Sequence, residues 1–226
     1  MCGRFVGFRK IDALIEHFPI EVTDVEMTAN FNVAPTQEVL AIVRHGGKNH
    51  LEHLNWGLVP FWAKDTSIGS RLINARAETA ASKPSFRQAF LKRRCLILAD
   101  GFFEWKRERG GKQPMFLTLP SGEPFAFAGL WESWDDRGRR KPPYRSATIL
   151  TREASPSVLP IHHRMPVILK PEAFDAWLDP NHQDVAALQA IIQNQIYTQL
   201  ASVPVSKRVN SPANNTPTNI RPLGTE

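Results

Sequence analysis

Cysteine and long apolar runs are scarce in this 226-residue chain. The only two cysteines, Cys2 and Cys95, are too few for a disulfide framework, which favours a reducing cytoplasm. Apolar runs such as residues 96–99 are far too short to span a bilayer, so we expect no membrane association. The first residues lack the charged and apolar regions of a secretory signal, and none is expected.

The basic residues are distributed unevenly. The net charge is +6 and the isoelectric point is near 9.6. Residues 71–112 contain 11 Lys and Arg against 4 Asp and Glu, whereas residues 1–40 contain 3 basic and 6 acidic residues. A concentrated basic stretch is typical of a protein that binds a phosphate backbone. A solvated basic surface without a partner explains the same counts.

Apolar periodicity predicts many strands and few helices. We expect helices over 10–18, 86–91, 172–178 and around 185–192, and strands over 38–44, 49–56, 94–100, 115–119, 124–131, 146–151, 164–169 and 203–209, with a loop at 31–37. Strands and helices do not alternate, which predicts an α+β fold with a single compact, mainly antiparallel, barrel-like β core and a few flanking helices. We expect one domain over 1–210 and a tail over 211–226 that is rich in Pro, Asn and Thr.

The position of Cys2 directly after Met1 allows an unusual chemistry. Cysteine is small enough for an aminopeptidase to remove the methionine before it, which would leave a thiol and a free α-amine on adjacent carbons. An α-amine titrates near pH 7.7–8.0 and is partly unprotonated in the cell. Such a 1,2-aminothiol can form a Schiff base with an aldehyde and close to a thiazolidine. Alternatively, Cys2 is an ordinary residue at a frayed end.

Other segments combine reactive side chains with aromatic or small neighbours. Glu104 lies between Phe103 and Trp105, where desolvation raises a carboxyl pKa and suits proton transfer; a strand-end glutamate in water is the alternative. Asn74 could hold a substrate hydroxyl or amine, and Arg76 a phosphate. A turn cap and a solvated charge are the corresponding structural interpretations.

Histidine and tryptophan provide further candidates. His162 and His163 are consecutive, so on an extended segment we expect them to face opposite ways, with one acting as an acid or base. Together with the cysteines they lack the spacing of a zinc site, and we expect no metal or cofactor. Trp56 and Trp62 could stack on nucleobases, although a place in the core or as a lid under a loop is the favoured interpretation for at least one of them.

Six separated motifs give the chain a specific resemblance. They are Met-Cys-Gly-Arg at 1–4, Asn-Phe-Asn-Val-Ala-Pro-Thr at 30–36, Trp-Gly-Leu-Val-Pro at 56–60 with Trp62, Asn-Ala-Arg-Ala-Glu at 74–78, Gly-Phe-Phe-Glu-Trp at 101–105, and Ile-His-His-Arg-Met-Pro at 161–166. In these motifs the chain resembles the SOS response-associated peptidase family, whose members shield abasic sites in single-stranded DNA. The resemblance covers roughly residues 2–210.

The resemblance implies a role for each candidate. Cys2 would form a thiazolidine with the ring-opened sugar, Asn74 would position its amine, Glu104 would transfer protons, and His162 would help to open the sugar. Phosphate contacts would come from Arg4, Arg76 and Arg164. Pro35, Trp56 and Trp62 would shape the pocket and hold the strand bent. The family name also implies self-removal of a leader, here Met1 alone, and lyase-like activity is a further expectation.

Two alternatives remain open on the residues. Glutamine amidotransferase domains also begin with Met-Cys-Gly, so the chain could be an N-terminal-nucleophile amidohydrolase or peptidase, although we find no Arg-Trp-Ala-Thr-His-Gly-like segment. A non-covalent single-strand-binding module would not need Cys2. Under the main hypothesis, the partner is abasic single-stranded DNA. The protein would be a cytoplasmic monomer, nucleoid-associated when bound and near replication-fork proteins.

Overall fold

A computed structural model describes residues 2–136 and 142–224. Its larger sheet is mostly antiparallel and follows the order β12-β11-β10-β7-β4-β5-β2. These strands are β12 (Arg164–Pro166), β11 (Tyr144–Glu153), β10 (Phe125–Trp134), β7 (Arg94–Ala99), β4 (Glu38–His45), β5 (Lys48–Trp56) and β2 (Val22–Thr23). Two short strands, β6 (Asn74–Arg76) and β13 (Ile168–Leu169), pair with β11 and β10.

The larger sheet curls back on itself. Besides its antiparallel pairing with β10, β11 pairs in parallel with the end of β5, where Ala147 faces Trp56. The sheet is therefore partly ring-like, without being a true barrel. Alternate residues of β4, such as Val39, Ala41 and Val43, point into the ring and pack with apolar residues from β7, β10 and β11. Burial on both faces explains why β4 and β7 are almost continuously apolar.

The opposite face of the larger sheet packs against helices. The α-helices are α1 (Ile11–Ile15), α2 (Ala77–Ala80), α3 (Arg87–Lys92), α4 (Phe174–Leu178) and α5 (Val185–Asn194), and the 3-10 helices are η1 (Thr66–Arg71), η2 (Pro171–Ala173), η3 (Lys207–Asn210) and η4 (Pro217–Ile220). Trp177 of α4 is fully buried and donates a hydrogen bond from its indole nitrogen to the Cys95 carbonyl at 3.1 Å. Among the described residues, no helix has both the length and the apolar character needed to cross a membrane.

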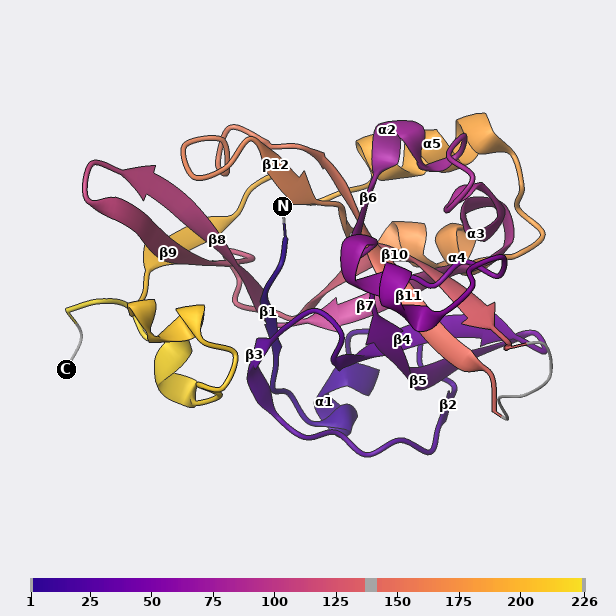
Figure 1. Cartoon of the computed structure of the whole chain (residues 1–226), viewed down its shortest axis with the longest axis horizontal. Helices are drawn as coiled ribbons and strands as arrows, with labels where there is room; N and C mark the ends of the chain where they lie inside the picture. Colours follow the sequence, from indigo (N-terminus) through magenta and orange to yellow (C-terminus); the bar gives the residue numbers. More distant parts are fainter. Residues whose placement is uncertain (1, 137–141, 225–226) are drawn as a thin grey trace.

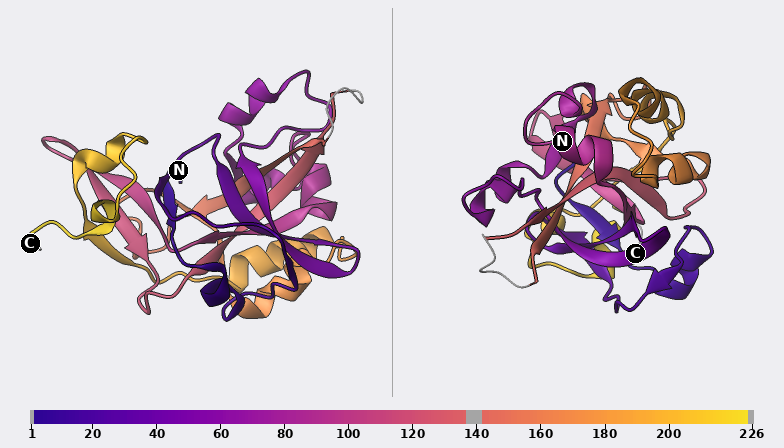
Figure 2. Two further views of the ribbon diagram at one scale, coloured as in Figure 1. Left: turned by 90° about the horizontal axis from the view of Figure 1, so that it is seen from below. Right: turned by 90° about the vertical axis from the view of Figure 1, so that its right-hand side faces the viewer.

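The smaller sheet forms a separate ribbon beside the ring. Its order is β14-β9-β8-β1-β3, with β14 (Ala201–Pro204), β9 (Gly111–Thr118), β8 (Gly101–Glu108), β1 (Phe5–Gly7) and β3 (Asn30–Val33). β1 lies between the β8–β9 hairpin and the larger sheet (Figure 1). Figure 2 shows this hairpin and the C-terminal segment at one end of the molecule, away from α4 and α5.

The predicted α+β class, the mainly antiparallel sheets and most of the elements are confirmed, and the differences have local causes. Residues 30–33 form β3 instead of a loop, because they pair with β1. The expected strand over 164–169 is divided at Val167 into β12 and β13. The expected strand over 203–209 is wrong beyond Pro204, since Ser206 caps η3 by accepting a hydrogen bond from the Arg208 amide. Residues 211–224 pack onto β3, where Asn219 is buried.

Candidate active site

Cys2 is held beside β8 by the backbone that precedes β1. Phe5 pairs with Phe102 across the sheet. At the residue before Phe5, the Arg4 carbonyl accepts a hydrogen bond from the Phe103 amide at 2.9 Å. Cys2 is completely buried and packs with the apolar residues inside the ring, including Phe5 and Trp56. The sequence alternative of a frayed residue at position 2 therefore does not describe the Cys2 side chain.

Asn74 fixes the backbone of Cys2 directly. Its side-chain amide nitrogen donates a hydrogen bond to the Cys2 carbonyl at 2.8 Å. β6 brings Asn74 there because it pairs in parallel with β11, with Asn74 beside Ile149. Two residues that are 72 positions apart in the sequence thus meet through the sheet, and an amide hydrogen bond of this kind restricts the orientation of the Cys2 α-carbon and its amine.

Glu104 lies in the middle of β8 and is only 3% exposed. This excludes the sequence alternative of a strand-end glutamate in water. The Cys2 thiol lies within its electrostatic reach: burial first, and then the negative charge of Glu104, raises the pKa of this thiol well above its ordinary value. The thiol of the folded chain is therefore neutral near pH 7, next to a buried carboxyl group.

His162 and His163 stack on one another instead of facing opposite ways. Their ring centroids are 4.4 Å apart with an interplanar angle of 27°. The expectation of opposite faces is wrong because these residues precede β12 in a bend, where strand alternation does not apply. His163 is exposed, and chiefly the charge of His162 lowers its pKa. Glu104 interacts electrostatically with His163, so the histidine pair and the Cys2 cluster are neighbours.

The backbone of Arg164 holds the ring of His162. The Arg164 amide donates a hydrogen bond to Nδ1 of His162 at 3.0 Å. The Arg164 carbonyl oxygen also lies 3.0 Å from Nδ1, where it accepts when this nitrogen carries a proton. These two contacts hold the His162 ring in one orientation.

The three arginines expected at phosphates differ sharply in their surroundings. Arg164 is buried and forms a two-pronged ion pair with Glu78 at 2.7 and 2.9 Å, and it also donates to the Thr151 carbonyl at 2.6 Å. Arg4 donates to the Asn32 side-chain oxygen at 2.7 Å and to the Val209 carbonyl at 2.9 Å. Arg76, at the end of β6, is exposed.

The aromatic candidates also divide into core and surface. Trp56 is fully buried, donates from its indole nitrogen to the Ile73 carbonyl at 2.9 Å, and contacts Phe5 edge-on at 5.1 Å between centroids. Trp62 is 48% exposed and follows the similarly exposed Phe61. Pro35 is half-buried in the turn after β3. Trp62 therefore has a face available for stacking, and Trp56 does not.

A glycine in the Trp-Gly-Leu-Val-Pro motif permits a close backbone contact. Gly57 has φ of +133°, and a β-carbon on it would lie 2.6 Å from the Gly69 carbonyl oxygen. Its amide donates to the Ala147 carbonyl at 2.8 Å. A larger residue at this position would separate the 57–60 segment from η1, which follows Trp62 in the chain.

The basic stretch at 71–112 is not one continuous surface. Arg94 is buried and donates to several backbone carbonyls, including those of Trp177 and Phe90 at 2.6 and 2.9 Å. Burial lowers the pKa of Arg94 to about 10. Arg93 pairs with the buried carboxylate of Glu132 at 2.7 Å. Part of the local charge excess thus stabilises the fold, and the remainder includes Arg76.

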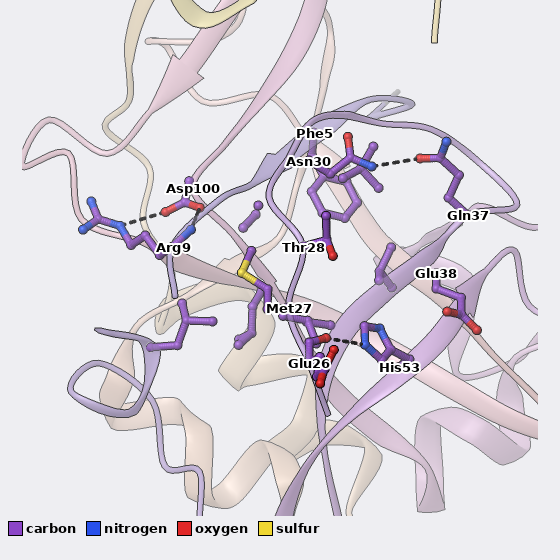
Figure 3. Close-up of a pocket in the computed structure, with 17 residues that line it drawn as sticks. Phe5, Arg9, Glu26, Met27, Thr28, Asn30, Gln37, Glu38, His53 and Asp100 are labelled. Atoms are coloured by element: carbon purple, nitrogen blue, oxygen red, sulfur yellow. Dashed lines mark hydrogen bonds and ion pairs between the residues drawn. The ribbon is translucent and has the colours of Figure 1, made fainter. Parts of the chain in front are cut away.

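A separate cavity of about 390 Å³ is lined by residues that include Phe5, Met27 and His53 (Figure 3). It is bordered by the 26–30 segment, by β4 and by the ends of β1 and β7. Arg9 pairs there with Asp100 at 2.8 Å. None of the four predicted catalytic residues lines this cavity. We place the candidate site at Cys2, because the buried thiol, the carboxyl group and the imidazoles are together there.

Comparison with known proteins identifies the family. The family model described as SOS response associated peptidase matches residues 1–212. The chain belongs to the SOS response-associated peptidase family. Abasic site processing protein YoqW of Bacillus subtilis is 44% identical over 220 residues, covering 96% of this chain and 97% of YoqW. YedK of Escherichia coli, also named an abasic site processing protein, is 31% identical over 233 residues, covering 99% of this chain and 100% of YedK.

Solved structures support the fold of this SOS response-associated peptidase. A crystal structure of a Bacteroides thetaiotaomicron protein superposes with a TM-score of 0.84 at 24% identity and covers 98% of this chain and 99% of its own. A phage-related protein of Bordetella bronchiseptica gives a TM-score of 0.70 at 27% identity, over 91% and 95% of the two chains.

In this SOS response-associated peptidase, sequence reasoning missed two residues that hold the predicted arginines in place. Glu78 holds Arg164, and Asn32 is fully buried, where it accepts from Arg4 and donates to the Ser211 carbonyl at 2.9 Å. Both belong to motifs that carry the family resemblance, which was the available signal. Their partners are 86 and 28 positions away, respectively, so spacing alone could not identify the pairs.

Proposed function

We propose that this protein processes abasic sites in single-stranded DNA by bonding covalently to the opened sugar through Cys2. The observation that carries the proposal is the meeting of the buried Cys2 and Glu104 with Asn74, with the His162 pair within electrostatic reach. The names of YoqW and YedK as abasic site processing proteins support the substrate. Removal of Met1, by the protein itself or by an aminopeptidase, is the first step of the proposal.

The reaction begins at the amine of the mature Cys2. The open form of an abasic sugar carries an aldehyde at C1′. The amine attacks this carbon and loses one water to give a Schiff base, and the thiol then adds to the same carbon and closes a five-membered thiazolidine. The hydrogen bond from Asn74 to the Cys2 carbonyl supports this step, because it restricts the direction of the amine.

Glu104 is proposed to carry the protons of both steps. The raised pKa of the Cys2 thiol means that a neutral thiol, and not a standing thiolate, meets the imine. Its proton must leave as the carbon–sulfur bond forms, and the imine nitrogen must gain one. A carboxylate within electrostatic reach of the thiol can take the proton and return it to the nitrogen.

His162 is proposed to favour the open sugar. The ring form of an abasic site is a hemiacetal, and it opens when its ring oxygen is protonated and its C1′ hydroxyl loses a proton. A ring N–H of His162 can donate a proton to that ring oxygen. The two backbone contacts of Nδ1 with Arg164 support this role, because they hold the imidazole in one orientation.

The DNA contacts are proposed to divide between binding and support. Arg76 and Trp62 are exposed, so they can meet a phosphate and stack on a flanking base. Arg4 and Arg164 can offer only the guanidinium edges that their protein partners leave, and Pro35 and Trp56 shape the pocket from behind. Selection of an abasic nucleotide needs no base-specific contact; it needs a pocket too small for a nucleotide that retains its base.

Intact-mass measurement after incubation with an abasic single-stranded oligonucleotide tests this function. We expect the mass of mature protein plus DNA minus one water, and no adduct with an oligonucleotide that retains all its bases. Cys2→Ala should abolish the stable adduct, whereas Cys95→Ala, at the other buried cysteine, should retain it. An adduct of the same mass and stability in Cys2→Ala would overturn the proposal.

A further inference from the structure

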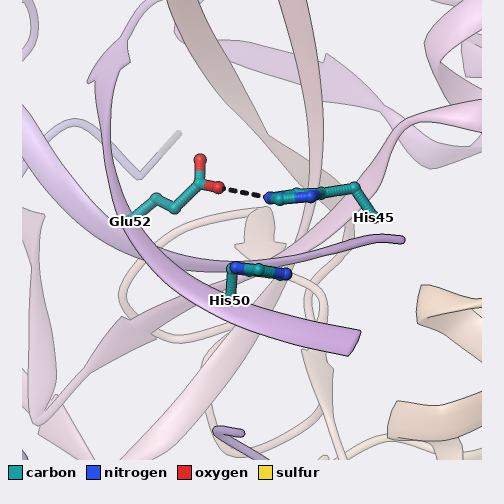
Figure 4. Close-up of side chains that lie close together, drawn as sticks. All are labelled: His45, His50 and Glu52. Carbon is teal, nitrogen blue, oxygen red and sulfur yellow. Dashed lines mark hydrogen bonds and ion pairs between the residues drawn. The ribbon is translucent and has the colours of Figure 1, made fainter. Parts of the chain in front are cut away.

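The β4–β5 hairpin carries a second group of reactive side chains, separate from the Cys2 group. Among the described residues, one set of three His, Cys, Asp or Glu side chains is arranged to hold a metal ion: His45, His50 and Glu52, whose ligand atoms lie within 4.8 Å of one another. Figure 4 shows Glu52 directed at the edge of the His45 ring, with the His50 ring stacked against it. The reaction proposed at Cys2 uses none of them.

The hairpin register explains why these side chains meet. β4 and β5 pair antiparallel, with Val43 opposite His50 and Ala41 opposite Glu52. Directly opposite residues share a face of the sheet, and so do residues two apart on one strand. His45, His50 and Glu52 therefore all project from the face that lines the ring, at the end of the strands where the ring opens to solvent.

The distances suit ligands that share one ion. Nε2 of His45 lies 2.9 Å from Oε1 of Glu52, and the two imidazole centroids are 3.6 Å apart with an interplanar angle of 15°. Ligand atoms about 2 Å from a common tetrahedral zinc ion are about 3.3 Å apart, close to the Nε2–Oε1 distance. The stacked rings themselves must reorient, because two parallel imidazoles do not direct their nitrogens at one ion. His45 is exposed and can turn its ring to direct its nitrogen at the ion, because no core packing holds it.

Glu52 also has the support that metal-binding carboxylates usually have. Arg145 of β11 bonds to its other oxygen, Oε2, and the guanidinium of Arg145 lies 4.5 Å from the centroid of the Trp131 ring. This contact fixes the carboxylate and leaves Oε1 directed at His45. Hydrogen bonding to the outer oxygen of a ligand carboxylate is a common second layer of a metal site.

We propose that His45, His50 and Glu52 bind a divalent transition-metal ion of the zinc class. Two imidazoles and one carboxylate match the borderline character of Zn²⁺, and a tetrahedral ion would keep a fourth position for water. Magnesium and calcium prefer oxygen ligands and are not expected there. The ion would join the end of β4 to β5 across the Gly46–Gly47 turn.

The direct test is a zinc titration of the tag-free protein by calorimetry, with ZnCl₂ as the only ligand. We expect one equivalent to bind, and we expect His45→Ala or His50→Ala to weaken the affinity by at least about tenfold, the usual order for loss of a ligand or its support. The matched control is His53→Ala. His53 lies on β5 but faces the other way and contacts the Glu26 carbonyl at 3.0 Å, so its loss should leave zinc affinity unchanged.

Two further measurements prevent a misleading result. The titration is repeated in a Cys2→Ala background, because zinc also binds thiols, and the hairpin site should remain. Cobalt(II) at the site should give the visible bands of tetrahedral coordination, and these should disappear in the His45→Ala/His50→Ala double variant. Zinc affinity that is equal in the double variant and the wild type, or absent from the wild type, would overturn the proposal.

Discussion

Two groups of polar side chains lie in different surroundings in this molecule. Beside the smaller sheet, Cys2 and Glu104 are buried, and backbone strands and Asn74 hold them in place. On the β4–β5 hairpin, His45 and Glu52 keep contact with water, and they are held by one another and by Arg145. Burial strips solvent from the Cys2 thiol and raises its pKa, and a perturbed thiol beside a buried carboxyl group suits covalent chemistry. Partial exposure leaves room for an ion to enter.

The largest expected effect tests whether the buried group at Cys2 is reactive. Glu104→Gln preserves the shape of the side chain but removes its ability to exchange a proton. We expect crosslinking to abasic DNA to slow by about 100-fold, the lower range for loss of an acid–base group. The measurement is a single-turnover time course on denaturing gels.

Glu108→Gln is the matched control for that experiment. Glu108 lies at the exposed end of the same strand, β8, and its variant should crosslink at the wild-type rate. A Glu104→Gln protein that reacts as fast as Glu108→Gln would remove Glu104 from the reaction. Both variants should unfold at similar urea concentrations, since neither removes side-chain volume.

The second prediction separates support from DNA contact among the arginines. Arg164→Met breaks the pair with Glu78 and the bond to Thr151, so the free energy of unfolding should fall by about 2–3 kcal/mol. Arg76→Met should change stability by no more than about 0.5 kcal/mol, because Arg76 is exposed. Urea denaturation of the two variants measures both values.

Arg76→Met should alter DNA binding, although it should hardly alter stability. This variant should lower the slope of log affinity against log salt by about 1, as expected when one phosphate contact is lost. An unchanged slope in Arg76→Met would remove Arg76 from the phosphate contacts. Equal stability of the Arg164→Met and wild-type proteins would show that the Glu78 pair does not support the fold.

Sequence reasoning anticipated the elements better than the contacts between them. The α+β class and strands such as β4, β5 and β7 followed from apolar patterns, because a buried strand leaves a direct trace in its own residues. β1 and β6 were missed: each has three residues and forms only because a distant strand pairs with it. The stacking of His162 on His163 depends on a bend that periodicity does not encode.

The candidate site shows the same division. Cys2, Asn74, Glu104 and His162 were singled out by residue type and motif, but burial decided between the alternatives for Glu104 and for Trp56. Exposure likewise distinguishes Arg76 from Arg164, although both are arginines in recognisable motifs. Residue chemistry can be seen in the sequence, whereas solvent access is a property of the assembled sheets.

The smallest expected effect is on the pH dependence of stability, and it compares the two buried thiols, Cys2 and Cys95. Burial raises the pKa of both, and Glu104 adds to the effect at Cys2 alone. Above about pH 8.5 the unfolded chain releases thiol protons that the folded chain retains, so stability is complete below that pH and falls as the pH rises. Each thiol can contribute a slope of up to about 1.4 kcal/mol per pH unit. Cys95→Ala should therefore lose about half of the wild-type slope between pH 8.5 and 10 in urea denaturation, and an unchanged slope would mean that burial of Cys95 does not control its proton.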